Sequence, residues 1–83
     1  MSIITGQQIR AARAALGWSA TTLADKAGVA MRTVARLEQT DGTPQTRLAT
    51  ILEIKRVLEV AGIEFIGSPD DRPGIRVSAK KNQ

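Results

Sequence analysis

Arg32 and Arg36 are the residues of this sequence whose type and spacing best suit molecular recognition. They stand four positions apart, which is about one turn of a helix, so both guanidinium groups would project from the same face. A guanidinium carries a rigid fork of N–H donors that fits a carboxylate, a phosphate or the major-groove edge of a guanine. An arginine pair on a helix can equally be a solvated surface. The elements that hold these two residues must therefore show which of the two roles applies.

Composition narrows the chemistry that the chain can perform. The sequence contains no histidine and no cysteine, which removes the usual nucleophile–base pairs, thiolate metal sites and disulfides. Asp70 and Asp71 lie on a proline- and glycine-rich turn without a catalytic partner in view, so we expect no enzyme activity, no metal and no cofactor. The 83 residues suffice for one small domain whose core would gain from dimerisation.

The excess of basic over acidic residues is larger in the first half of the chain. The net charge is +4, a balance that suits a polyanionic partner but is also common in soluble proteins. Up to residue 47 there are six basic residues (Arg10, Arg13, Lys26, Arg32, Arg36 and Arg47) against three acidic ones (Asp25, Glu38 and Asp41). We therefore expect a surface for a polyanion in this half.

Residues 20–39, ATTLADKAGVAMRTVARLEQ, contain two short helical patterns joined by a turn. Gly28 stands in that turn, where the chain needs the positive φ that glycine adopts without steric cost. In the second helix, at about 100° per residue, one side holds Ala30, Val34 and Leu37, and the other holds Arg32, Ala35, Arg36 and Gln39. This pattern predicts a helix-turn-helix whose second helix, residues 30–39, can enter the major groove of DNA.

The pattern resembles the lambda-repressor/Cro family of helix-turn-helix regulators, also called the xenobiotic-response-element (XRE) family. The resemblance covers Ile9 to Leu58 and is carried by Gly17, Ser19, Leu23, Ala24, Ala27, Gly28, Val29, Thr33, Val34, Arg36, Leu37, Glu38 and Pro44. Ala20 and Ala30 depart from it, because the family usually has glutamine and serine there. The resemblance implies a mainly α, four-helix, lambda-repressor-like DNA-binding domain over residues 1–62.

Within this motif, three side chains are predicted to read bases: Met31, Arg32 and Arg36. The resemblance places Met31 at a base-reading position, where its apolar side chain would suit a thymine methyl group. Phosphate contacts are predicted for Ser19, Thr21, Thr33, Gln39, Thr43, Thr46 and Arg47. Trp18 is predicted to cover the small core, with base stacking as the alternative.

The first helix should start at a capping box, Thr5-Gly6-Gln7-Gln8, and end at Gly17. Arg13 falls on the buried stripe of this helix, and a buried guanidinium needs a carboxylate. Glu38, at the border of the core face of the recognition helix, is the candidate, and the resemblance implies the same pairing. The alternative is that Arg13 extends its charged end to solvent.

A fourth helix is predicted from Pro44, with Thr43 as its N-cap, to Ala61. Two short strands follow, at 63–66 and 75–77, separated by a turn-rich segment. They can form a short C-terminal β-hairpin on the fourth helix or dimer-forming strands that pair with a second chain. Residues 63–77 are thus predicted to support dimerisation, and the predicted dimer interface is Ile54, Val57, Ala61, Phe65, Ile66, Ile75 and Val77. Residues 78–83 are expected to be a disordered basic tail.

These features favour a homodimeric, sequence-specific transcription regulator of double-stranded DNA, most simply a repressor that excludes polymerase from an inverted-repeat operator. The alternative is an antitoxin, whose fourth helix and strands bind a partner protein, a toxin, while the motif autoregulates its operon. The N-terminus lacks the features of a signal peptide, and no apolar run reaches the length of a membrane span. We therefore expect a cytoplasmic protein that does not bind membranes.

Overall fold

The computed structural model describes residues 4–39 and 47–78 of the 83. Its elements are α1 (Gly6–Leu16), α2 (Ala20–Ala27), α3 (Met31–Glu38), α4 (Leu48–Val60), β1 (Ile63–Ser68) and β2 (Asp71–Val77). The predicted mainly α fold with a C-terminal β-hairpin is confirmed. Thr43, Thr46 and the tail after Ser78, for which the sequence made predictions, lie outside the described residues.

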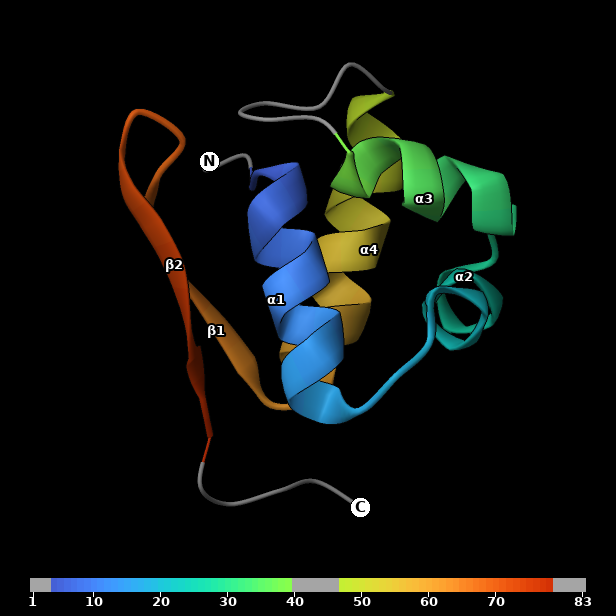
Figure 1. The fold of residues 1–83 in the computed structure, drawn as a ribbon, viewed down its shortest axis with the longest axis horizontal. Coiled ribbons are helices and arrows are strands. Elements are labelled where there is room, and N and C mark those ends of the chain that lie inside the picture. The colour runs from blue at the N-terminus through green and yellow to red at the C-terminus, as the bar shows by residue number, and fades with distance from the viewer. Residues whose placement is uncertain (1–3, 40–46, 79–83) are drawn as a thin grey trace.

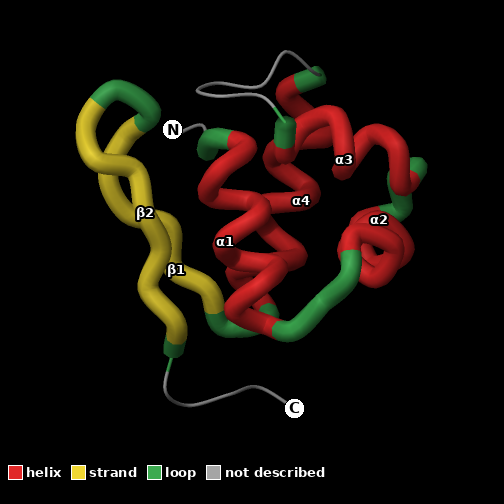
Figure 2. Tube along the Cα trace, in the orientation of Figure 1, coloured by secondary structure: helices red, strands yellow, loops and turns green. Residues whose placement is uncertain are grey.

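α1 and α4 form the centre of the molecule, with the other elements on either side of them (Figure 1). α2 and α3 pack on one side, while the hairpin lies on the opposite side, where β2 contacts α1 and β1 contacts α4. Figure 2 shows the same division, with the strands separated from α2 and α3 by the two central helices. The outward face of α3 is therefore far from the hairpin.

The core is formed by aliphatic side chains from the four helices, from Ile4 before them and from Ile63 of β1, and Ile75 of β2 packs against it. The largest fully buried side chains are Ile4, Ile9, Leu23, Val34, Leu37, Ile54 and Leu58. Val34 and Leu37 occupy the predicted inner face of α3. Ala30 does not, because it is the exposed N-cap of that helix rather than a member of its first buried turn.

Local sequence signals define both ends of α1. The Thr5 hydroxyl accepts from the Gln8 amide at 3.1 Å, and the Gln8 carboxamide oxygen accepts from the Thr5 amide at 2.8 Å. This is the predicted capping box, and it satisfies two donors at the start of the helix. Gly17 ends α1 with φ 71° and Gly28 ends α2 with φ 70°, so the positive φ predicted for the turn glycine is confirmed.

α4 is shorter than predicted. Arg47 has φ −52° and ψ 133°, which is not helical, and the helix begins only at Leu48. The prediction of a helix running continuously from Pro44 was therefore wrong at Arg47, although Pro44 itself lies outside the described residues. The helix ends at Val60, with Ala61 as its C-cap.

The hairpin is longer than predicted, and both of its strands belong to one chain. β1 and β2 pair antiparallel from Ile63↔Val77 to Ser68↔Asp71, with an irregularity between Ile66 and Ser68. At Gly67, which has φ 74°, an added Cβ would collide with the backbone carbonyl of Arg72. Glycine therefore allows the two strands to approach closely here, and the pairing continues through residues whose composition had suggested a loop.

Two members of the predicted dimer interface belong instead to the core of the single chain. Ile54 is 0% exposed and Val57 is 8% exposed, because both belong to the buried core cluster of the single chain. They are unavailable to a second subunit unless the fold opens, so their assignment to the interface was wrong. Ala61, Phe65, Ile66 and Ile75 are half-buried, and Val77 is 47% exposed.

Candidate nucleic-acid interface

α3 presents Arg32 and Arg36 outward, while Val34 and Leu37 fix it to the core. Met31, Arg32 and Arg36 are exposed, and Met31 retains 49% of its accessible surface. Val34 and Leu37, on the opposite face, are at most 1% exposed. The three predicted base-reading residues thus lie together on one exposed surface, which the buried face holds in place.

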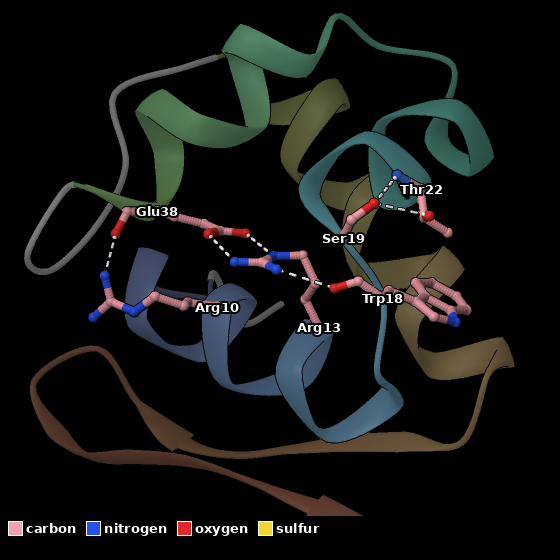
Figure 3. Close-up of polar contacts among 6 residues, drawn as sticks. All are labelled: Arg10, Arg13, Trp18, Ser19, Thr22 and Glu38. Carbon is pink, nitrogen blue, oxygen red and sulfur yellow. Dashed lines mark hydrogen bonds and ion pairs between the residues drawn. The ribbon is translucent and has the colours of Figure 1, made fainter.

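Arg13 joins α1 to both helices of the helix-turn-helix (Figure 3). Its Nε donates to Glu38 Oε2 at 2.7 Å and its Nη2 donates to Glu38 Oε1 at 2.8 Å. The remaining nitrogen, Nη1, donates to the backbone carbonyl of Trp18 at 3.0 Å, directly before the start of α2. A single guanidinium therefore sets the end of α3 and the entry to α2 relative to α1.

The Arg13–Glu38 pair is well shielded from water. The side chain of Arg13 is 22% exposed and that of Glu38 is 8% exposed. The hydrogen bond to the Glu38 side chain raises the pKa of Arg13 above its ordinary value, against the opposing effect of burial. The guanidinium stays charged throughout the pH range in which proteins are studied.

Arg10, one turn before Arg13, makes a contact that the sequence reasoning missed. Its Nη1 donates to the backbone carbonyl of Glu38 at 3.1 Å, as Figure 3 shows. Glu38 is thus held twice from α1, through its side chain by Arg13 and through its main chain by Arg10. The sequence carries no local signal for this bond, because Arg10 and Glu38 are 28 positions apart.

The predicted phosphate contacts are spread over the ends of three helices. Ser19 is the N-cap of α2, where its Oγ accepts from the Thr22 amide at 3.0 Å and lies 3.0 Å from the Thr22 hydroxyl. Thr21 is exposed on the first turn of α2 and Thr33 is half-buried on α3. Gln39 and Arg47 are exposed, as the C-cap of α3 and the N-cap of α4.

Trp18 packs at the edge of the core with part of its ring exposed. The Lys26 ammonium lies 5.1 Å from the centroid of the ring, within the range of a cation–π interaction. This position fits the predicted cover over the core. The lysine contact was not predicted, because nothing in the local sequence joins the two residues.

A family model described as helix-turn-helix matches residues 9–62, which is more than half of the chain. The chain belongs to this helix-turn-helix family. A search of curated proteins found no match. The matched residues begin in α1 and end just after α4. They include the whole exposed surface of α3, and also Arg10 and Arg13, the α1 residues whose side chains hydrogen-bond to Glu38.

Membership in this helix-turn-helix family has functional consequences. The family is of the XRE, lambda-repressor-like type, so the chain is a DNA-binding transcription regulator that recognises double-stranded DNA. It is a family of regulator domains rather than of enzymes. Among the residues that the structure describes, no helix has the length and apolarity needed to cross a membrane.

Proposed function

We propose that this protein represses transcription by binding an inverted-repeat operator as a homodimer. The observation that carries the proposal is the division of α3 between two faces. Met31, Arg32 and Arg36 are exposed together, while the opposite face is fixed by buried side chains and by the arginines of α1. A reading surface that is held rigidly before DNA arrives loses less conformational entropy on binding.

In this mechanism, α3 lies in the major groove with its exposed face toward the base edges. Arg32 and Arg36 each direct a guanidinium fork to the O6 and N7 atoms of a guanine, and Met31 contacts a thymine methyl group. Phosphate contacts from Ser19, Thr21 and Thr33, together with Gln39 and Arg47, fix the register of the protein on the duplex. Thr43 and Thr46 remain part of this proposal although they lie outside the described residues.

The dimer is assigned to the hairpin side of the molecule. Val77 is 47% exposed and Val60, at the end of α4, is 60% exposed, and a two-stranded sheet leaves strand edges that a second chain can extend. Ala61, Phe65, Ile66 and Ile75 contribute their remaining exposed surface. Two subunits would place their recognition helices about 34 Å apart, so half-site centres would lie about 10 base pairs apart.

The antitoxin alternative receives less support. It needs a large apolar surface on α4, but Ile51, Ile54 and Leu58 are at most 2% exposed within the chain's own core. Among the described residues of α4 and the hairpin, the exposed large apolar side chains left for a toxin are Leu48, Val60 and Val77. A homodimer that covers the same two valines would use this surface itself.

Selection of duplexes from a random pool at about 150 mM salt tests the proposal. The wild type should recover an inverted repeat, and Arg32→Ala and Arg36→Ala should each relax one base pair per half-site at a loss of about 1–3 kcal/mol. Arg72→Ala is the matched control, because it removes an arginine from the hairpin, where 91% of the side chain is exposed. Recovery of no preferred sequence, or equal losses on all sequences, would remove α3 from the base-reading role.

A further inference from the structure

α3 has weaker ends than the other helices of the motif. Its N-cap, Ala30, makes no side-chain capping bond. Its C-cap, Gln39, keeps a right-handed helical backbone conformation, whereas α1 and α2 both end at a glycine in the left-handed conformation. A helix of eight residues is marginal in isolation, so the position of its last turn depends on contacts from other parts of the chain.

Arg10 supplies such a contact to the backbone itself. Its Nη1 donates to the carbonyl of Glu38, the last residue of α3, at 3.1 Å. Carbonyls in the last turn of a helix have no partner within the helix and carry its partial negative charge, so a cation that donates to one of them stabilises this end. At Glu38, Arg13 donates to the side-chain carboxylate, whereas Arg10 donates to the backbone carbonyl.

We propose that Arg10 is a positioning residue for base reading: it fixes the last turn of α3, and thereby the guanidinium of Arg36, in the orientation that the operator requires. The inference rests on the proposed function of α3. Arg36 is two residues before Glu38, in the last turn, whereas Arg32 is in the first turn of the helix. Loss of Arg10 therefore affects reading by Arg36 more than reading by Arg32.

Binding by Arg10→Met distinguishes this role from a direct phosphate contact. Methionine keeps an unbranched apolar stem without the donor, and Arg72→Met on the hairpin is the control for charge. The expected result is a loss of about three- to tenfold on the selected operator, with reduced discrimination at the base pair that Arg36→Ala relaxes. Discrimination at the Arg32-dependent base pair and the salt slope should match those of the control.

A phosphate contact would give a different result. Affinity for all sequences would fall equally, and the log–log salt slope would become shallower by about 0.9 per subunit relative to wild type, while the ratio between operator and unrelated DNA stayed constant. That outcome, or no change in binding, would overturn the positioning role.

Hydrogen exchange without DNA tests the anchor separately from the operator. In Arg10→Met, amide exchange in the last turn of α3 should accelerate about three- to tenfold, while exchange at Leu23 in α2 should stay as in wild type. Arg10→Lys, which keeps the charge and one donor group, should give an intermediate rate. Unchanged exchange in α3 would refute the positioning role of Arg10 even if α3 reads DNA. Faster exchange in a protein that selects no DNA sequence would instead show that Arg10 holds α3 but that the proposed function is wrong.

Discussion

Replacing Arg13 with methionine should be among the most destabilising single changes in the chain outside the aliphatic core. It leaves the Glu38 carboxylate, 8% exposed, without the two hydrogen bonds that Arg13 donates to it. Breaking a fully buried ion pair by removing one partner costs about 3–5 kcal/mol. Because Arg13 is 22% exposed and water can enter the space that it leaves, we expect a smaller loss of about 2–3 kcal/mol.

The Glu38→Leu change tests whether this loss comes from the isolated carboxylate. The double variant Arg13→Met/Glu38→Leu removes the charge that Arg13→Met leaves unpaired, so it should be more stable than Arg13→Met alone. The coupling free energy between the two changes should be about 2 kcal/mol. For a domain of this size, the loss in Arg13→Met corresponds to a fall in Tm of about 8–24 °C.

Urea unfolding measured by far-ultraviolet circular dichroism gives these free energies. Fluorescence of Trp18 is a poorer probe, because Arg13 contacts the carbonyl of that residue at 3.0 Å. The exposed pair between Arg76 and Glu64, at 3.3 Å, is the control, and its coupling should be about 0.2–1 kcal/mol. If the losses of Arg13→Met and Glu38→Leu simply add, the Arg13–Glu38 ion pair does not stabilise the fold, and the loss in Arg13→Met does not come from the unpaired carboxylate.

Two further predictions concern the attachment and the shape of the hairpin. Gln8→Ala removes one half of the capping box and the side-chain donor to the carbonyls of Ile66 and Gly74, at 3.2 and 2.8 Å. It should therefore lower the free energy of unfolding by about 2–3 kcal/mol. A loss below about 0.5 kcal/mol in urea titration would contradict this role of Gln8. Gly67→Ala forces a Cβ against the Arg72 carbonyl, so strand amides should exchange faster while α3 stays protected. Gly28→Ala meets no neighbouring atom, so its cost should be limited to about 1–2 kcal/mol for the left-handed φ that alanine must adopt.

The parts of the fold that could be predicted depend on interactions close in sequence. Gly17 and Gly28 mark helix ends, because a left-handed residue is needed there, and Thr5 with Gln8 marks a helix start at a spacing of three residues. The inner face of α3 followed from helical periodicity. These rules apply within one or two turns of chain, and the structure agrees with them at Val34 and Leu37.

The features that escaped prediction depend on contacts between distant segments. Gln8 bonds to Ile66 and Gly74 across 58 and 66 positions, and no local pattern announces either bond. The strands extend into residues such as Pro73 and Gly74 because pairing across the hairpin overrides their loop preference. For the same reason, Ile54 was assigned to a partner subunit: periodicity shows that a face is apolar, but not whether other elements of the same chain bury it.

The separation of the two faces of α3 also bears on how this protein could be retargeted. The contacts that keep α3 in place come from Val34, Leu37 and Glu38, and none of them involves Met31 or Arg32. Exposed positions of this kind usually tolerate substitution within about 0.5 kcal/mol of stability. Under the proposed base-reading role, substitutions at Met31 and Arg32 would change the preferred operator while the buried face of α3 packs as before.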